Sequence, residues 1–203
     1  ATAVGVDALS VVSPYYFRIS DDALVAHFCA VAKAVPEVPV FLYNLPQCVG
    51  NAITPRMVEE TISHAPNVVG LKDSAGDLKL LRDFISLGLP GLQVACGSDV
   101  LVFEALKLGA SASVSGNANA FPEVVVELFR CYWAGDLIGA ARQQALLDVV
   151  RNALRNGQSI ALIKRAVEMR GLRCGPVRPP LPEVTAEEVE TARVALSVAG
   201  LLG

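Results

Sequence analysis

Short apolar runs alternate with longer helix-like stretches through the first 115 residues, and this rhythm limits the possible folds more than any other feature of the sequence. The apolar runs lie at residues 8–13, 38–43, 68–72, 92–96 and 112–115. Stretches with helix-start signals lie between them, at residues 20–34, 54–64, 77–87 and 99–108. Because continuous apolar runs are typical of strands buried on both faces, the pattern predicts an α/β fold with a parallel sheet.

After residue 115 the pattern predicts helices alone. They are expected at about residues 121–134, 136–156, 159–170 and 185–201. No low-complexity linker separates them from the strands. We therefore expect one structural domain, with βα units in residues 1–122 and only helices in residues 123–203, the last of which form a C-terminal tail.

Five parallel strands fit two architectures, an open doubly wound sheet or part of an eight-stranded barrel. Periodicity alone does not decide between them. However, no strand is followed by the pattern G-x-G-x-x-G of dinucleotide-binding sheets, and the phosphate-binding pattern G-x-x-x-x-G-K is also absent. The barrel is therefore favoured.

The composition argues against nucleic acid and membrane partners. The net charge is −3, and the sequence has no run of lysines or arginines that would bind nucleic acid or an anionic membrane. Every apolar run is interrupted before about 18 residues, the length that a membrane span needs. Five scattered cysteines and two histidines show no metal-ligand or disulfide spacing, so we expect no metal. With no secretory signal recognised, we expect a cytoplasmic protein that acts on small molecules.

Polar residues gather where four of the predicted strands end, and parallel α/β folds place their active sites there. Lys72 closes an apolar strand, where a lysine is costly to bury as an ammonium ion. Desolvation lowers the pKa of such an amine toward the neutral form that attacks carbonyl groups, so Lys72 is a candidate nucleophile. Tyr43 ends the preceding strand and is a candidate proton donor and acceptor. The alternatives are an ion pair of Lys72 with Asp73 or Asp77, and a tyrosine that only packs in the core.

Two further strand ends carry candidate residues. Tyr15 and Tyr16 follow the first strand, and one of them can extend the proton path from Tyr43, unless both only pack. Gly97 and Asp99 belong to a turn that opens a helix. Such a turn offers backbone N–H groups and a carboxylate to a substrate, although it can equally serve only as a helix cap.

Together these strand ends resemble the dihydrodipicolinate synthase and N-acetylneuraminate lyase family of pyruvate-dependent class I aldolases, which are (β/α)8 TIM barrels. The motifs that carry the resemblance are Pro14-Tyr15-Tyr16, Tyr43-Asn44-x-Pro46, Gly70-x-Lys72-Asp73-Ser74-x-Gly76-Asp77, Gly97-Ser98-Asp99 and Asn119-x-x-Pro122-Glu123. They occur in the family's order, and the resemblance extends from about Val6 through the helical tail. It implies that this chain supplies the last five βα units of such a barrel.

The resemblance also implies roles for individual residues. Lys72 matches the lysine that forms a Schiff base with pyruvate or another 2-oxo acid, Tyr43 the tyrosine that shuttles protons, and Tyr16 the second tyrosine of the relay. Val114 falls where the eighth strand lines the pyruvate pocket. Ser74, Gly97 and Asp99 are the other expected substrate-binding residues. An aldehyde is the expected second substrate, no metal or organic cofactor is expected, and the family suggests a homotetramer.

The sequence departs from the family pattern in two places. The first three βα units, roughly 90 residues of a barrel of ordinary size, have no counterpart ahead of Ala1, and neither does their Gly-Thr-Thr-Gly-Glu turn for the pyruvate carboxylate. We therefore interpret the sequence as a fragment, whose own activity is in question. The second departure is Cys48, which stands where dihydrodipicolinate synthases carry an arginine for the second substrate's carboxylate. This counts against a dihydrodipicolinate synthase, while Lys72-Asp73-Ser74 and the Pro176–Pro180 turn are more similar to 2-keto-3-deoxy sugar-acid aldolases.

Three other functions remain open from the sequence. A dehydratase or deaminase could use the same lysine without cleaving a carbon–carbon bond. A catalytically silent barrel remnant could bind a 2-oxo acid or serve as an assembly subunit. A doubly wound binding domain would show a reversal of strand order in its sheet.

Overall fold

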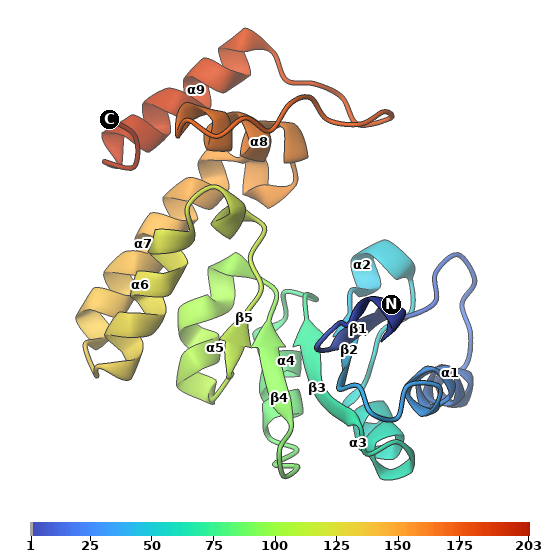
Figure 1. Ribbon diagram of the computed structural model, residues 1–203. Helices are drawn as coiled ribbons and strands as arrows, with labels where there is room; N and C mark the ends of the chain where they lie inside the picture. The colour runs from blue at the N-terminus through green and yellow to red at the C-terminus, as the bar shows by residue number, and fades with distance from the viewer. Residues whose placement is uncertain (1) are drawn as a thin grey trace. The chain divides into compact units, whose positions relative to one another are not determined.

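The computed structural model describes residues 2–203 (Figure 1). These residues form two compact units, one that ends at Val114 and a second that comprises Ser115–Gly203. The first unit contains all the strands, and the second contains helices only. The division predicted between residues 122 and 123 separates the βα units from the last barrel helix and the tail. It does not describe separate compact units, so it stays a prediction.

The first unit is built on one five-stranded sheet in which every neighbouring pair of strands is parallel. Its strands are β1 Leu9–Val12, β2 Val40–Asn44, β3 Val68–Asp73, β4 Gln93–Cys96 and β5 Ala112–Ser113. They lie in the order in which they occur in the sequence. A doubly wound sheet reverses its order at a switch point, so that alternative is wrong for this chain.

Helices cover one face of this sheet, because connections between consecutive parallel strands are right-handed and return on the same side (Figure 1). They are α1 Asp21–Lys33, α3 Pro55–His64, α4 Leu78–Ile85 and α5 Val102–Leu108. Between sheet and helices lies the core, where alternate strand residues such as Leu42 and Leu71 meet helix residues such as Phe28, Met57 and Phe84. All five of these side chains are at most 1% exposed.

The opposite face of the sheet is only partly buried among the described residues. In β2 the buried residues Val40, Leu42 and Asn44 alternate with the half-buried Phe41 and Tyr43. Strands buried on both faces were predicted from the continuous apolar runs. The difference arises because the helices of this chain cover one face, and the second face carries the residues of interest for function.

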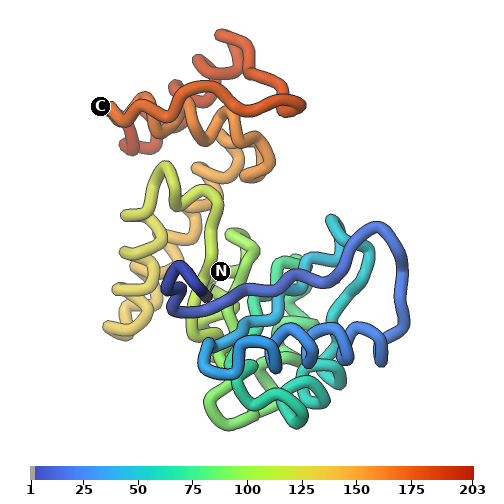
Figure 2. Tube along the Cα trace, turned by 45° about the vertical axis from the view of Figure 1, so that its right-hand side comes forward, coloured from blue at the N-terminus to red at the C-terminus, as the bar shows by residue number. Residues whose placement is uncertain are grey.

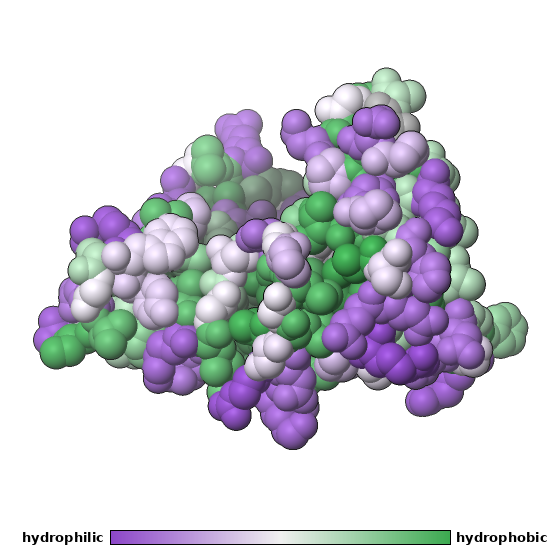
Figure 3. All heavy atoms as spheres, turned by 90° about the horizontal axis from the view of Figure 1, so that it is seen from below, coloured by the Kyte–Doolittle hydropathy of each residue, from purple (hydrophilic) through white to green (hydrophobic). Residues whose placement is uncertain are grey.

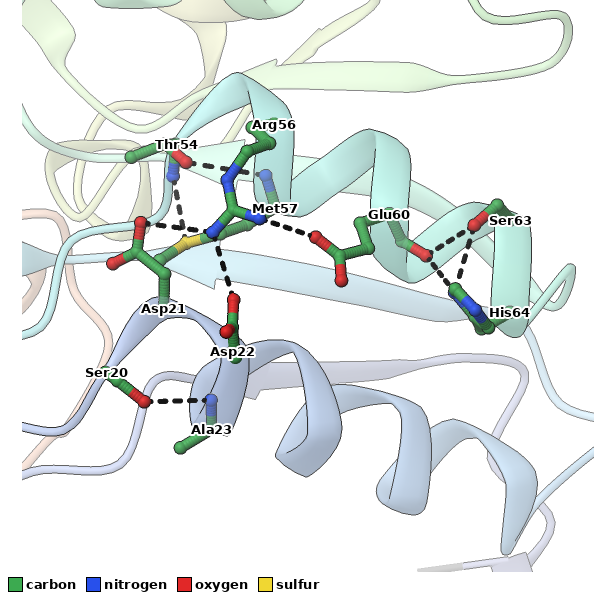
Figure 4. Close-up of polar contacts among 10 residues, drawn as sticks. All are labelled: Ser20, Asp21, Asp22, Ala23, Thr54, Arg56, Met57, Glu60, Ser63 and His64. Atoms are coloured by element: carbon green, nitrogen blue, oxygen red, sulfur yellow. Dashed lines mark hydrogen bonds and ion pairs between the residues drawn. The ribbon is translucent and has the colours of Figure 1, made fainter.

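A long loop connects β1 to α1. After β1 the chain forms a wide loop, residues 13–20, which passes beside the short helix α2 (Pro46–Val49) before it descends to α1 (Figure 2). Where the loop meets α1, the exposed Arg56 of α3 pairs with Asp21 and Asp22 at the start of α1, as well as with Glu60 of its own helix (Figure 4). The loop therefore ends at a helix start that is tied to α3.

The second unit contains four helices, which account for the predicted helical tail. They are α6 Pro122–Trp133, α7 Leu137–Ala153, α8 Ile160–Met169 and α9 Ala186–Val198. α6 packs along α7, and α9 contacts both α7 and α8. The helix predicted at residues 136–156 ends earlier, because Arg155 and Asn156 adopt left-handed backbone conformations at a short 3-10 turn.

Hydrophobic residues also reach the surface, where they lie among hydrophilic ones in the space-filling view (Figure 3). In the second unit they include Val126 and Trp133 of α6 and Ile138 of α7, each at least 65% exposed. Within residues 2–203, none of the helices combines the length and the hydropathy that crossing a bilayer requires.

Candidate active site

Lys72 and Tyr43 lie in contact on the sheet face that the helices leave uncovered. The parallel register sets Tyr43 directly opposite Lys72, and their helix-facing neighbours Asn44 and Asp73 are likewise opposite each other. The Lys72 Nζ lies 4.0 Å from the centroid of the Tyr43 ring. A protonated amine over the face of an aromatic ring is attracted by the ring's quadrupole, so this contact is of the cation–π type. A tyrosine and a lysine 29 positions apart in the sequence thus share one place at the carboxyl ends of two strands.

Small residues flank Lys72 on the side away from Tyr43. The register aligns Lys72 with Ala95 of β4, and Ala95 in turn with Ala112 of β5. Both neighbours on this side are therefore alanines, whose side chains add little bulk next to the amine.

An aromatic ring lies one level below the Lys72–Tyr43 pair, toward the amino ends of the strands. The Phe41 ring lies across Gly70, and a Cβ built on Gly70 would overlap the Phe41 ring atoms. Gly70 is therefore required for close packing of this ring rather than for an unusual backbone angle. Phe41 gives the site an apolar floor, which disfavours water beneath the amine.

A buried polar network braces the same two strands on the helix side. Asn44 Nδ2 donates to Asp73 Oδ1 over 2.7 Å, and Asn44 Oδ1 accepts from the backbone N–H of Ile53 over 2.9 Å. The backbone N–H of Ala75 donates to the same Asp73 oxygen. Burial raises the pKa of the Asp73 carboxyl, and the hydrogen bond from Asn44 opposes that shift. The brace fixes the strand ends at which Tyr43 and Lys72 stand.

The next turns bring Ser74 and Gly97 together. The backbone N–H of Gly97 donates to the Asp73 carbonyl over 2.7 Å, and a Cβ at Gly97 would overlap the Ser74 hydroxyl. Two residues further on, Asp99 begins a three-residue 3-10 turn, Asp99–Leu101, and is half-buried. Val114 follows β5, is 49% exposed, and donates its N–H to the Cys96 carbonyl. Ser74 and Gly97 thus meet directly, whereas Asp99 and Val114 belong to neighbouring turns of the same unit.

Tyr16 is in a different situation from Tyr43 and Lys72. Its side chain is 86% exposed, and its ring makes an edge-to-face contact with Phe17. Its φ is +79°, a left-handed conformation that is uncommon for an aromatic residue and costs about 1–3 kcal/mol. The structure therefore does not pack Tyr16 against the Lys72–Tyr43 pair, and its predicted place in a proton relay stays a prediction.

The cysteines differ in accessibility. Cys48 lies on α2 and is exposed, whereas Cys96 at the end of β4 is 1% exposed. Burial raises the pKa of the Cys96 thiol to about 11. Among the residues that the structure describes, no three His, Cys, Asp or Glu side chains gather as a metal site would require.

The sequence profile of the dihydrodipicolinate synthetase family matches residues 1–199. A 4-hydroxy-tetrahydrodipicolinate synthase of a Thermoanaerobacter species is 31% identical over 202 residues, which are 100% of this chain and 68% of that relative. The chain belongs to the dihydrodipicolinate synthetase family. Another family relative, named an uncharacterized DapA-like lyase of Halobacterium salinarum, is 34% identical and is covered over 66% of its length. The chain thus spans about two thirds of these relatives.

Solved structures of the family have the same fold. One is the E. coli prophage protein YagE in complex with pyruvate, with a TM-score of 0.91 and 29% identity over 98% of this chain and 68% of that one. Another is dihydrodipicolinate synthase of Thermotoga maritima, with a TM-score of 0.92 and 25% identity over 99% of this chain and 69% of that one. The family and the barrel fold predicted from the strand-end motifs are confirmed. The prediction of an enzyme of the lyase class is also confirmed, because relatives in the family are named as synthases and lyases.

Sequence reasoning missed several residues that shape this site. Asn44 stood inside a recognised motif, but the motif did not reveal that its side chain bonds Asp73. Ala95 and Ala112 carried no signal, because only the strand register places them beside Lys72. Phe41 could have been found by period-2 alternation, since it precedes Tyr43 by two residues on the same face.

Proposed function

We propose that the protein is a Schiff-base-forming lyase that makes or cleaves a carbon–carbon bond between pyruvate and an aldehyde. Lys72 is the nucleophile, and Tyr43 moves the protons. The observation that carries the proposal is the contact of the Lys72 amine with the Tyr43 ring, on a sheet face with an apolar floor and small neighbours. Membership of the family and the pyruvate complex of the related YagE support pyruvate as the substrate.

The chemistry follows from a lysine amine next to a phenol. The Lys72 nitrogen attacks the keto carbon of pyruvate, the carbinolamine loses water, and an imine forms. Loss of a methyl proton gives an enamine, whose terminal carbon adds to the aldehyde carbonyl. Hydrolysis of the new imine then releases the product and the amine. Each step requires a proton to be given or taken, which is the role proposed for the Tyr43 hydroxyl.

The amine lies over the ring of Tyr43 rather than beside its hydroxyl. The long lysine side chain has several rotatable bonds, so rotation about them can move Nζ from the ring toward the phenol oxygen. Contacts between catalytic groups are often loose in the unliganded enzyme and tighten when substrate binds. We expect the imine to draw the two groups into this closer arrangement.

The second substrate is proposed to be an aldehyde that carries no carboxylate, because residue 48 is not suited to bind one. Cys48 lies exposed on α2, and a thiol cannot form the paired hydrogen bonds that an arginine makes with a carboxylate. We therefore expect a hydroxyaldehyde such as glyceraldehyde to be accepted more readily than aspartate semialdehyde. A comparison of kcat/KM for the two aldehydes with pyruvate tests this expectation, and a preference for aspartate semialdehyde would contradict it.

Exchange of the methyl protons of pyruvate with deuterium from D2O tests the central steps without an aldehyde. The complete gene product should exchange them, as followed by proton NMR, because the enamine forms and reverts. Lys72→Ala should abolish the exchange, and Tyr43→Phe should slow it by about 100-fold, the usual size of a general acid–base contribution. Exchange that persists in Lys72→Ala would remove the proposed mechanism. The carbon-bond reaction is separated from a dehydratase or deaminase by product analysis.

A further inference from the structure

The Asn51 side chain forms hydrogen bonds with loop residues both before and after Tyr16. Its Nδ2 donates to the carbonyls of Pro14 and Phe17, each over 2.8 Å, and its Oδ1 accepts from the N–H of Ile19 over 3.2 Å. Both amide hydrogens and the amide oxygen are therefore used. Asn51 itself is 5% exposed, and its three hydrogen bonds to the loop are part-buried.

The three bonds enclose the strained part of the loop. Pro14 and Phe17 lie on either side of Tyr16, whose backbone has a φ of +79°. A conformation that costs about 1–3 kcal/mol persists only when the surrounding structure fixes it. The side chain of Tyr16 is 86% exposed, so packing of its ring contributes little to that fixation. The bonds of Asn51 act on the backbone itself and supply the constraint.

Asn51 is itself connected to the Lys72–Tyr43 pair. The segment after α2 turns at Gly50, which is left-handed with a φ of +81°. Two residues after Asn51, the N–H of Ile53 donates to the Asn44 side chain, which in turn donates to Asp73. The buried hydrogen bonds of Asn44 and the part-buried ones of Asn51 are thus joined by the backbone of residues 51–53, which connects the strand ends of Lys72 and Tyr43 to the loop of Tyr16.

We propose that Asn51 is a positioning residue that holds the Tyr15–Tyr16 loop in the backbone conformation from which Tyr16 acts in proton transfer. The proposal rests on the proposed function for its catalytic consequence, whereas its structural part stands without it. Asparagine suits the position because it offers two donors and one acceptor at short reach. In Asn51→Asp, an ionised carboxylate would face the carbonyls of Pro14 and Phe17 and repel both.

Limited proteolysis tests the structural part independently of any activity. Trypsin cleaves after arginine, and Arg18 is an exposed residue of this loop. Asn51→Ala loses all three hydrogen bonds, and Asn51→Asp loses the two that the amide nitrogen donates. Each bond is worth a factor of about five, so the loop should open more often and the rate of cleavage after Arg18 should rise by about tenfold or more in both variants. Cleavage at the wild-type rate in both variants would overturn the proposal.

Asn67→Ala is the matched control. Asn67 Nδ2 also donates to three backbone carbonyls, those of Ala32, Val35 and Val38, over 3.0–3.1 Å. These lie around the turn between α1 and β2, away from the loop of Tyr16. Asn67→Ala should leave cleavage after Arg18 unchanged. An equal acceleration in Asn67→Ala would show general destabilisation and would contradict a specific role for Asn51.

Deuterium exchange of pyruvate tests the catalytic part. If Asn51 acts through Tyr16, Asn51→Ala and Tyr16→Phe should each slow the exchange, and the double variant should be no slower than Tyr16→Phe alone. Reduction of the imine with borohydride should still trap pyruvate on Lys72 in all three variants. Slowing that multiplies in the double variant, or no slowing in Asn51→Ala, would overturn the catalytic part. Failure of the wild type to trap pyruvate would instead refute the proposed function, and proteolysis would still decide whether Asn51 holds the loop.

Discussion

Removal of the Asn44 side chain should lower the free energy of unfolding more than removal of the Asn67 side chain. Asn44 is 0% exposed and joins Asp73 to the backbone N–H of Ile53. In Asn44→Ala both partners stay buried and lose this hydrogen bond. An unsatisfied buried group costs about 1–3 kcal/mol, and more if it is charged, so the two losses together should cost about 3–5 kcal/mol. Asp73 retains the N–H of Ala75, which keeps the cost within this range.

Urea denaturation followed by circular dichroism measures this loss. Unfolding free energies of domains are about 5–15 kcal/mol, so a loss of this size would move the transition midpoint far outside experimental error. Asn67→Ala provides the comparison, because Asn67 is half-buried and its three hydrogen bonds are part-buried, whereas those of Asn44 are buried. We expect it to lose about 1–2 kcal/mol. If Asn44→Ala lost less than about 1 kcal/mol, or no more than Asn67→Ala, the buried brace would not have the energetic role assigned to it.

Three further predictions concern the same sheet. Gly70→Ala should lower stability by about 1–3 kcal/mol in thermal unfolding, because the new Cβ overlaps the Phe41 ring and lies 2.7 Å from a backbone oxygen of β4; an unchanged Tm would be evidence against this packing. Because the folded-state pKa of Asp73 is raised by burial, the wild type should lose stability relative to Asp73→Asn as the pH rises above 3.8, and a difference independent of pH would contradict this. Iodoacetamide at neutral pH should label the exposed Cys48 well before Cys96, whose thiol is buried with a pKa of about 11; peptide mass spectrometry that found equal labelling would refute the burial of Cys96.

The sequence predicts the sheet well, because strand formation here depends on local patterns. Each of the five apolar runs overlaps an observed strand, and the boundaries differ by at most two residues. The short helix α2 was missed, since four residues give no helical period. The break near Arg155 was missed as well, although the dipeptide Asn156-Gly157 is a recognised turn signal.

The candidate site was predicted in part. Lys72 and Tyr43 could be found because each stands at the polar end of an apolar strand, and their contact follows from a parallel register that hydrophobic patterning implies. The roles of Asn44 and Asn51 could not be found, because each depends on where a side-chain amide meets backbone groups distant in sequence. Tyr16 was identified by a motif, but its left-handed backbone is a property that no local pattern indicates.

Trapping of the imine tests the central claim most directly. The complete gene product is incubated with pyruvate and sodium borohydride, and the modified peptide is identified by mass spectrometry. We predict one adduct, with the mass of pyruvate less one oxygen atom, on the peptide that contains Lys72. The adduct should be absent from Lys72→Ala and present in Lys79→Ala, which removes an exposed lysine paired with Asp83. No adduct on the wild type, or one that remains in Lys72→Ala, would contradict the account.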